Sequence, residues 1–374
     1  MSKKVGIITM HRVLNPGSVL QAYALFKQVC KMGYECEIID YQYPNAIHSE
    51  KDKECDSDLK KALKMLLLRI RFFILYRGRL QRKRYLRFIN ENLSLSKYYP
   101  TKESLFEDSP EYDVYMTGSD QVWNPGCMKG DESFFCAWKR DCKRISYASS
   151  FSTSIIPAIY KEHYSTYLSK YDFLGVREQA AVDIIKELTG KQSFVVCDPT
   201  MLLTKADYLP LLKFSKIHKK RPYILVYALT YAYNPYPQME TIIEMVKEKM
   251  GLPVVYLYTN SIDHYHYKGS ITSAGPCEFI DLFMNASFVV TSSFHGTAFA
   301  LNFGVPFYSI VPDSVSSDSR IMSLLQLVGA SDRAIRVSQY KDSVDVDMDY
   351  MPISKLIENL RQDSYNFLEE SLKH

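Results

Sequence analysis

The sequence lacks the marks of a membrane or secreted protein. Its 374 residues contain no apolar run of the roughly 18 residues that a membrane span needs. The start, MSKKVGIITM, is too short in apolar residues for a signal peptide and continues as a strand pattern. The eight cysteines form no C-x-x-C pair, and no Cys/His group has zinc spacing. We therefore expect a cytoplasmic protein with free thiols and no metal site.

Strong charge imbalance is also missing. The 46 Lys and Arg against 42 Asp and Glu leave a net charge of only +4, which does not indicate a nucleic-acid partner. Apolar residues make up 47% of the chain, which excludes an intrinsically disordered protein. At about 100–200 residues per domain, the length suggests two domains with a sizeable core.

What the sequence does contain is a regular alternation of strands and helices. The first unit has an apolar run at Val5–Met10, a helical pattern at Val19–Lys31 and a strand at Cys36–Tyr41. A second such series begins at Phe173–Val176. The alternation predicts an α/β protein with two doubly wound domains.

We place the domains accordingly. The first is expected at 1–170, with a basic helical insertion at about 50–100, and the second at 171–350. Residues 351–374 are predicted to form a C-terminal helix that packs back on the first domain. The basic segment Lys213–Arg221 fits a linker.

The insertion contains a basic and apolar stretch, Lys60–Phe88, with eleven Lys and Arg and no acidic residue. Such a pattern is typical of a helix that lies on an anionic membrane surface. It is equally compatible with helices that pack on the first domain and leave their cations in solvent. Nucleic acid is the least favoured partner.

Three polar motifs follow predicted strands, where open α/β sheets bind their ligands. The first is the turn from Asn15 to Ser18. Gly17 allows close approach to the backbone, and the helix that follows offers free N–H groups to an anion. The alternative is an ordinary turn with Ser18 as the helix N-cap.

The second motif is GSDQVWNP, after the strand Val114–Thr117. Asp120 can accept a proton from a hydroxyl or hold a sugar. Trp123 is of a type that often stacks on sugar faces. The other polar candidates for substrate binding here are Ser119, Gln121 and Asn124. The alternative is a turn composed of its usual residues.

The third motif is TSSFHGT, which opens a helix after the strand Phe288–Thr291. Here His295 is the candidate catalytic residue, with Ser293 and Gly296 beside it. The alternative is a histidine that only packs locally. Arg177 and Arg320 also stand between a strand or loop and a helix, so each could bind phosphate or carboxylate, or form a surface ion pair.

Together these blocks resemble a known family. The blocks are VGIITMHRVLNPGSVLQAYAL, IIDYQYP, YDVYMTGSDQVWNP, RISYASSFS, GVREQAAVDII, VVCDPTMLL, SFVVTSSFHGTAFALNFGVPF and SRIMSLLQLVG. They look like the polysaccharide pyruvyl transferases from Val5 to about Gly329. GSDQVWNP and SSFHG, in this order and at this distance, are the specific parts.

The resemblance implies two Rossmann-like domains facing a cleft, as in GT-B glycosyltransferases. It implies phosphoenolpyruvate as donor, a sugar with two suitably placed hydroxyls as acceptor, a cyclic pyruvate ketal as product, and no metal or nucleotide cofactor. The expected acceptor is lipid-linked, at the inner face of the plasma membrane. The chemistry then suits His295 as acid, Asp120 as base or acceptor-holding group, and Arg177 as partner of the donor's anionic groups.

The chain departs from the family pattern at two positions. Ser293 stands where better-known members have an arginine, so Arg320, Arg12 or His11 are the candidates to replace that cation. Pro16 stands where relatives often have an aromatic residue. The alternatives are a GT-B glycosyltransferase that uses a nucleotide sugar and a non-catalytic relative that binds a glycan or membrane.

Overall fold

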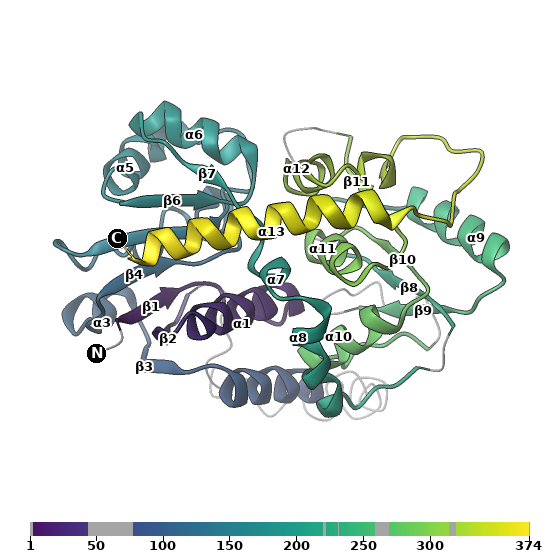
Figure 1. Cartoon of the computed structure of the whole chain (residues 1–374), viewed down its shortest axis with the longest axis horizontal. Coiled ribbons are helices and arrows are strands. Elements are labelled where there is room, and N and C mark those ends of the chain that lie inside the picture. Colours follow the sequence, from purple (N-terminus) through teal and green to yellow (C-terminus); the bar gives the residue numbers. More distant parts are fainter. Residues whose placement is uncertain are drawn as a thin grey trace, which may run out of the picture.

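A computed structural model describes residues 3–43, 78–219, 222–230, 232–258, 269–313 and 319–373. Within these ranges the chain forms two parallel β-sheets, each covered by helices (Figure 1). The prediction of two α/β units is confirmed. Residues 44–77, which hold most of the basic insertion, lie outside the described residues.

The first sheet has seven strands in the order β3-β2-β1-β4-β5-β6-β7. They are β1 (Lys4–Ile8), β2 (Glu35–Tyr41), β3 (Leu95–Tyr99), β4 (Val114–Thr117), β5 (Lys143–Ser149), β6 (Phe173–Val176) and β7 (Phe194–Val195). Each neighbouring pair is parallel. Strands such as β4 are buried along their whole length, which explains why they read as continuous apolar runs.

This sheet continues beyond residue 170, where we expected the first domain to end. Phe173–Val176 pairs with β5, and Phe194–Val195 pairs with β6. The expected boundary therefore does not coincide with the edge of the sheet. The chain crosses to the second sheet between Val195 and Ile224, a segment that includes the predicted linker. Strand patterns give the order of elements along the chain but not the sheet to which an edge strand belongs.

The second sheet has five strands in the order β12-β11-β10-β8-β9, again all parallel. They are β8 (Ile224–Tyr227), β9 (Val254–Leu257), β10 (Phe288–Thr291), β11 (Phe307–Val311) and β12 (Ala334–Arg336). In each sheet the strand order reverses once beside the first strand of that sheet. Such reversals create the positions where α/β sheets bind ligands.

Helices connect most of the strands and cover the sheets. The helices are α1 (Pro16–Lys31), α3 (Lys102–Glu107), α4 (Pro125–Met128), α5 (Ala158–Leu168), α6 (Gln179–Thr189), α7 (Pro199–Leu202), α8 (Lys205–Tyr208), α9 (Gln238–Met250), α10 (Pro276–Asn285), α11 (Phe294–Phe303), α12 (Ser319–Leu327) and α13 (Tyr350–Lys373). Helix α1 is the first helix after β1, and α11 is the first helix after β10. Both strands lie at a reversal of strand order, so the N-termini of these two helices lie at the edges where α/β sheets bind ligands.

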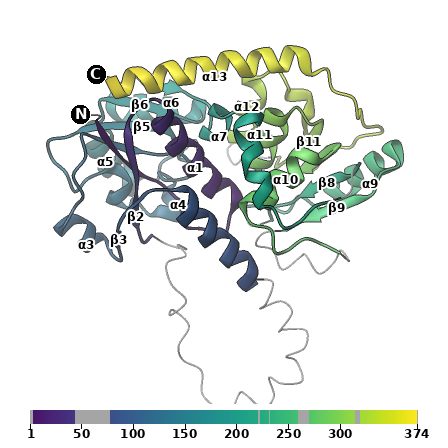
Figure 2. The same ribbon diagram turned by 60° about the horizontal axis from the view of Figure 1, so that its bottom comes forward.

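The long helix α13 runs across both halves of the molecule (Figure 2). At its start, Tyr350 donates a hydrogen bond to the carbonyl oxygen of Leu301 in α11. Further along, Ser364 accepts a hydrogen bond of 2.8 Å from the backbone N–H of Cys197. At its end, Lys3 bonds to the carbonyl oxygen of Lys373 at 2.9 Å. The C-terminal helix therefore contacts α11 at its start and residues next to β7 and β1 further along.

The described end of the basic stretch packs inward. Residues 78–92 are helical, and the side chains of Tyr85 and Phe88 are buried in the core. Arg84 forms an ion pair of 3.2 Å with Glu278 of α10. Arg79 and Lys83 remain exposed. In this part of the stretch the packing alternative accounts for the apolar residues, while residues 60–77 lie outside the described structure. Within the described ranges, no helix is long and apolar enough to cross a membrane.

Candidate functional site

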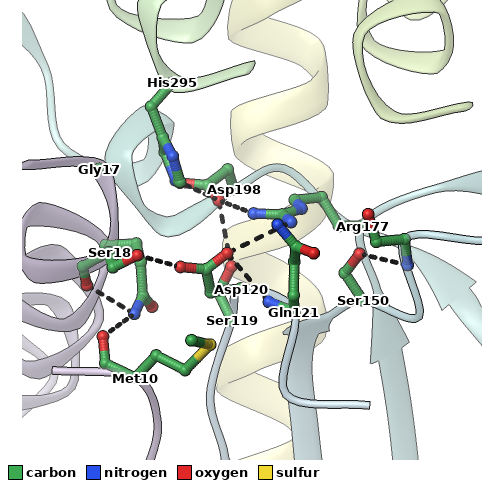
Figure 3. A network of polar contacts seen from close by, with 12 residues as sticks. Met10, Gly17, Ser18, Ser119, Asp120, Gln121, Ser150, Arg177, Asp198 and His295 are labelled. Atoms are coloured by element: carbon green, nitrogen blue, oxygen red, sulfur yellow. Dashed lines mark hydrogen bonds and ion pairs between the residues drawn. The ribbon is translucent and has the colours of Figure 1, made fainter. Parts of the chain in front are cut away.

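The polar motifs converge where the two sheets meet (Figure 3). Gly17 and Ser18 begin α1 after β1, and Ser119 and Asp120 follow β4. The pair β1 and β4 forms the reversal of the first sheet. His295 opens α11 after β10, beside the reversal of the second sheet. The motifs, far apart in sequence, thus occupy the carboxyl edges at which α/β folds bind ligands.

Asp120 is held in an unusual backbone conformation. Its φ of 75° lies in the left-handed region that most side chains avoid. Ser18 donates a hydrogen bond to Oδ2, and the backbone N–H of Gln121 donates one of 2.9 Å to Oδ1. Such local strain is common at functional sites. The carboxylate is buried but joins α1 to the loop after β4.

Arg177 lies at the centre of a buried ionic network. Its Nη1 donates a 3.0 Å hydrogen bond to Oδ2 of Asp198, while Nη2 lies 3.7 Å from Asp120 and Nε lies 4.0 Å from Glu178. The guanidinium also stacks over the Phe294 ring, 4.4 Å from its centroid. Its Nε and Nη2 have no hydrogen-bond partner. Arg177 is thus not in the surface ion pair that one alternative predicted.

Asp198, which we did not select from the sequence, is the hub of this network. Its Oδ2 accepts hydrogen bonds from Ser119 Oγ at 3.1 Å and from Arg177, and it lies 3.5 Å from His295 Nε2. Its Oδ1 caps α7 through Thr200. The available signal was an Asp-Pro pair directly after the strand Phe194–Cys197, the same kind of position as the other motifs.

His295 packs against the first sheet's half of the molecule. A Cβ placed on Gly17 would stand only 2.0 Å from His295 Nδ1, so this contact requires glycine. Gly296 is also required, because a Cβ there would meet Thr291 Oγ1 at 2.3 Å. Ser293 caps α11 by accepting a 3.3 Å hydrogen bond from the N–H of Gly296. Glycine at position 17 therefore allows the imidazole of His295 to contact the first turn of α1. Glycine at position 296 allows the first turn of α11 to pack against Thr291.

The site carries more negative than positive charge. Burial by itself would raise the pKa of the Asp198 carboxyl, but His295 and Arg177 hold that pKa below its ordinary value. Burial lowers the pKa of Arg177, yet Asp198, Asp120 and Glu178 together raise it. Glu178 Oε1 accepts hydrogen bonds from Ser150 Oγ at 2.8 Å and from two backbone N–H groups, while its Oε2 has no hydrogen-bond partner. All three carboxylates therefore share one guanidinium.

Some predicted substrate-binding residues have structural roles. Trp123 is fully buried, stacks on Phe135 at 5.7 Å and donates from Nε1 to the carbonyl oxygen of Phe134, so it offers no face to a sugar. That prediction is wrong, because the side chain of Trp123, although it lies within the polar motif, is buried among aromatic residues. Asn124 caps α4, and its amide donates to Gln121 Oε1 at 2.7 Å.

Asn15 is likewise an N-cap. Its Oδ1 accepts from the N–H of Gly17 at 2.9 Å and from that of Ser18. The alternative that made Ser18 the N-cap is wrong, since Ser18 lies inside α1 and directs its hydroxyl to Asp120. Asn15 can position the first turn of α1, but its oxygen is already used.

The candidates for the missing cation differ in their surroundings. Arg12 makes a bidentate pair with Asp40 at 2.7 and 3.1 Å, and His11 also contacts Asp40 at 3.0 Å, so both side chains already have a partner. Arg320 lies in the first turn of α12. Burial raises the pKa of the Cys127 thiol to about 11; Asp120 adds to that rise and Arg320 opposes it, so both charges act on this thiol. Arg320 is thus the candidate at the edge of the site.

Comparison with known proteins agrees with these blocks. The family described as polysaccharide pyruvyl transferase matches residues 15–314. The chain belongs to this family. Membership makes it a transferase of polysaccharide biosynthesis and confirms the resemblance drawn from the sequence. No curated protein matches the sequence.

Solved structures show the fold. UGT89C1 of Arabidopsis thaliana, complexed with UDP-L-rhamnose, has a TM-score of 0.51 and 10% identity, covering 100% of this chain and 98% of its own. UDP-GlcNAc 2-epimerase from Methanocaldococcus jannaschii has a TM-score of 0.49 and 12% identity, covering 96% and 92%. At such identities a likeness concerns the fold alone, and that to UGT89C1 confirms the predicted GT-B architecture. In the part of the chain that the structure describes, no group of three or more His, Cys, Asp or Glu residues is arranged to hold a metal ion.

Proposed function

We propose that this protein transfers the pyruvyl group of phosphoenolpyruvate to two hydroxyls of a sugar, forming a pyruvate ketal and releasing phosphate. The observation that supports this most is the convergence of Arg177, Asp120 and His295 from both sheets. They supply a fixed cation, a carboxylate and an imidazole, which are the three kinds of group that the reaction needs. Family membership provides the reaction class.

Arg177 is the proposed anchor for the donor. Its Nη2 is 3.7 Å from Asp120 and lacks a hydrogen bond, so a donor carboxylate or phosphate oxygen would take Asp120's place there. The N-termini of α1 and α11 add partial positive charge. Arg320, on the edge of the site, would contribute the second cation that Ser293 does not provide.

The proton transfers follow from the donor's structure. His295 gives a proton to the methylene carbon, which becomes a methyl group and leaves positive charge on the adjacent carbon. A sugar hydroxyl attacks that carbon while Asp120 takes its proton. Phosphate then leaves with the electron pair of its bond, and the second hydroxyl closes the ketal. Of the two hydroxyl protons, one balances the proton placed on carbon and the other ends on phosphate.

The acceptor is proposed to be a sugar on a lipid carrier at the cytoplasmic face of the membrane, in the synthesis of a surface polysaccharide such as a capsule or exopolysaccharide, or of a cell-wall glycan. A neutral sugar suits an acid-rich site, because its hydroxyls can bond to carboxylates without adding negative charge. The cations of the 60–88 stretch would bring the protein to an anionic membrane that carries such an acceptor.

Phosphate release from phosphoenolpyruvate, with and without an extract of lipid-linked sugars, tests the proposal. We expect release that depends on the extract. If the protein instead released UDP from UDP-sugars under the same conditions, and released no phosphate from phosphoenolpyruvate, the glycosyltransferase hypothesis would be favoured. No turnover of either donor, together with glycan binding, would indicate a non-catalytic relative.

A further inference from the structure

We propose that Asp198 is the positioning residue of the site, fixing His295 and Arg177 in their working geometry through a single carboxylate oxygen. The inference rests on the proposed function for its chemistry but on contacts for its geometry. Oδ2 receives Arg177 Nη1 at 3.0 Å and Ser119 Oγ at 3.1 Å, with His295 Nε2 at 3.5 Å. The first two groups come from the first sheet's half, and His295 comes from the other.

Asp198 is not suited to accept a proton from the substrate. Its other oxygen, Oδ1, is used by the N–H of Thr200 at 3.0 Å and by the Thr200 hydroxyl at 2.7 Å. Both of its oxygens thus already accept hydrogen bonds from protein side chains or backbone. Its part is therefore to act through His295 and Arg177, whereas Asp120 remains the carboxylate available to the acceptor.

Hydrogen bonds from α11 and α13 hold the segment that carries Asp198 on both sides of that residue. Ser364 of α13 accepts from the N–H of Cys197 at 2.8 Å, just before it. Just after it, Asn302 of α11 donates to the carbonyl oxygens of Thr200 at 2.9 Å and Leu203 at 2.8 Å. Arg361 of α13 donates to Met201 at 2.7 Å. These bonds fix the place where the chain passes from one sheet to the other.

Two consequences follow for the reaction. Asp198 Oδ2 places a negative charge 3.5 Å from His295 Nε2, an atom without a hydrogen-bond partner, so the carboxylate orients the imidazole by charge. The bond to Nη1 holds the guanidinium so that Nη2 and Nε stay without hydrogen-bond partners. In the described structure, the acidic residues that form ion pairs with Arg177 are Asp120, Glu178 and Asp198, and Asp198 also lies beside His295.

Asp198→Asn tests the assignment, because the amide keeps the size and can still cap α7 through its oxygen. We expect kcat to fall about 10²-fold, in line with the loss of an acid catalyst's support. The high-pH limb of the rate profile should move to lower pH, because the carboxylate beside His295 loses its negative charge. Asp183→Asn, an exposed position on α6, is the matched control and should leave both unchanged. Wild-type kcat and profile in Asp198→Asn would overturn the proposal.

A measurement without substrate separates this proposal from the proposed function. In protein labelled with ¹⁵N-histidine, with His295→Gln used to assign the signals, we expect Asp198→Asn to change the chemical shifts of the His295 ring nitrogens, because the carboxylate 3.5 Å away is replaced. That shift would support the positioning role even if phosphoenolpyruvate proved not to be the donor. An unchanged ring response in an enzyme that does turn over phosphoenolpyruvate would overturn the positioning role alone.

A second variant guards against a folding defect. Asp198→Glu keeps the charge but displaces it, so we expect the wild-type pH profile with a lower kcat. Should the Asn variant fail to fold, the Glu variant decides: a profile that moves despite the retained charge would overturn the proposal. A purely structural residue would give lower kcat in both variants with no movement of either profile.

Discussion

The backbone of Gly17 lies directly against the imidazole of His295, and a Cβ on Gly17 would stand 2.0 Å from Nδ1. The two residues come from different halves of the molecule, so this contact aligns the first turn of α1 with the first turn of α11. The short motif around Gly17 therefore provides room for a side chain of the other sheet. A change in this contact would therefore alter how the N-termini of α1 and α11 together bind a ligand.

Gly17→Ala should lower activity without unfolding the protein. The added methyl must push His295 away, and a displacement of about 1 Å can cost roughly 10² in rate. The helix itself should tolerate alanine, which is a better helix former than glycine. Turnover and thermal melting, measured side by side, check this expectation. Gly78→Ala, at a position with nothing within 4 Å of the added Cβ, is the control. Equal activity in both variants would show that the contact is dispensable.

The cluster of Asp40 with His11 and Arg12 predicts a pH dependence of stability. Burial raises the pKa of Asp40, but hydrogen bonds and charge from His11 and Arg12 lower it from 3.8 to about 2. A pKa lowered in the folded state means stability that is complete above about pH 4 and is lost as pH falls toward 2. At about 1.4 kcal/mol per unit, the contribution is about 2 kcal/mol.

Asp40→Asn tests this directly. Urea unfolding at several pH values should show lower stability at pH 7 and a flatter decline between pH 4 and pH 2 than in the wild type. The exposed Asp108→Asn should change neither. If the slope of the Asp40 variant equals that of the wild type, the cluster is not what stabilises the loop before α1.

Trp123 should matter for folding and not for sugar binding. It is fully buried among Phe135, Phe151 and Tyr171. Replacing it with alanine should cost about 3–5 kcal/mol of folding free energy. Trp123→Phe should cost less and leave the KM for the acceptor unchanged. A raised acceptor KM in a stably folded Trp123→Phe protein would restore the sugar-stacking hypothesis.

Much of this could be predicted from the sequence, for a physical reason. Buried parallel strands such as Val114–Thr117 and Phe288–Thr291 read as apolar runs, and both were placed at their observed bounds. Residues just after such strands share an edge, which brought Asp120, Arg177 and His295 together. The direction of side chains could not be predicted from the sequence: Trp123 points into the core, whereas its neighbour Asn124 is only half-buried. Asp198 was missed because its role depends on three distant partners.

The cations of the 60–88 stretch, among which Arg79 and Lys83 are exposed, should bind anionic membranes. We expect flotation with anionic vesicles that weakens with salt, and about fivefold weaker binding for each cation removed, from about 1 kcal/mol each. Because Arg84 pairs with Glu278, the test variant is Arg79→Gln with Lys83→Gln, both exposed. Lys186→Gln with Lys355→Gln removes the same charge from exposed positions on α6 and α13. Equal losses in the two double variants would refute docking through this stretch.

The most direct test of the whole account follows the donor carbon. Phosphoenolpyruvate labelled with ¹³C in its methylene group is incubated with lipid-linked sugar acceptors and with wild-type protein, His295→Ala or the control His218→Ala, whose histidine side chain is 70% exposed. The account predicts a labelled ketal methyl on the acceptor with wild type and control, and a rate lower by about 10²–10⁴ with His295→Ala. Transfer at the wild-type rate by His295→Ala, or no label on the acceptor with any of the three proteins, would contradict it.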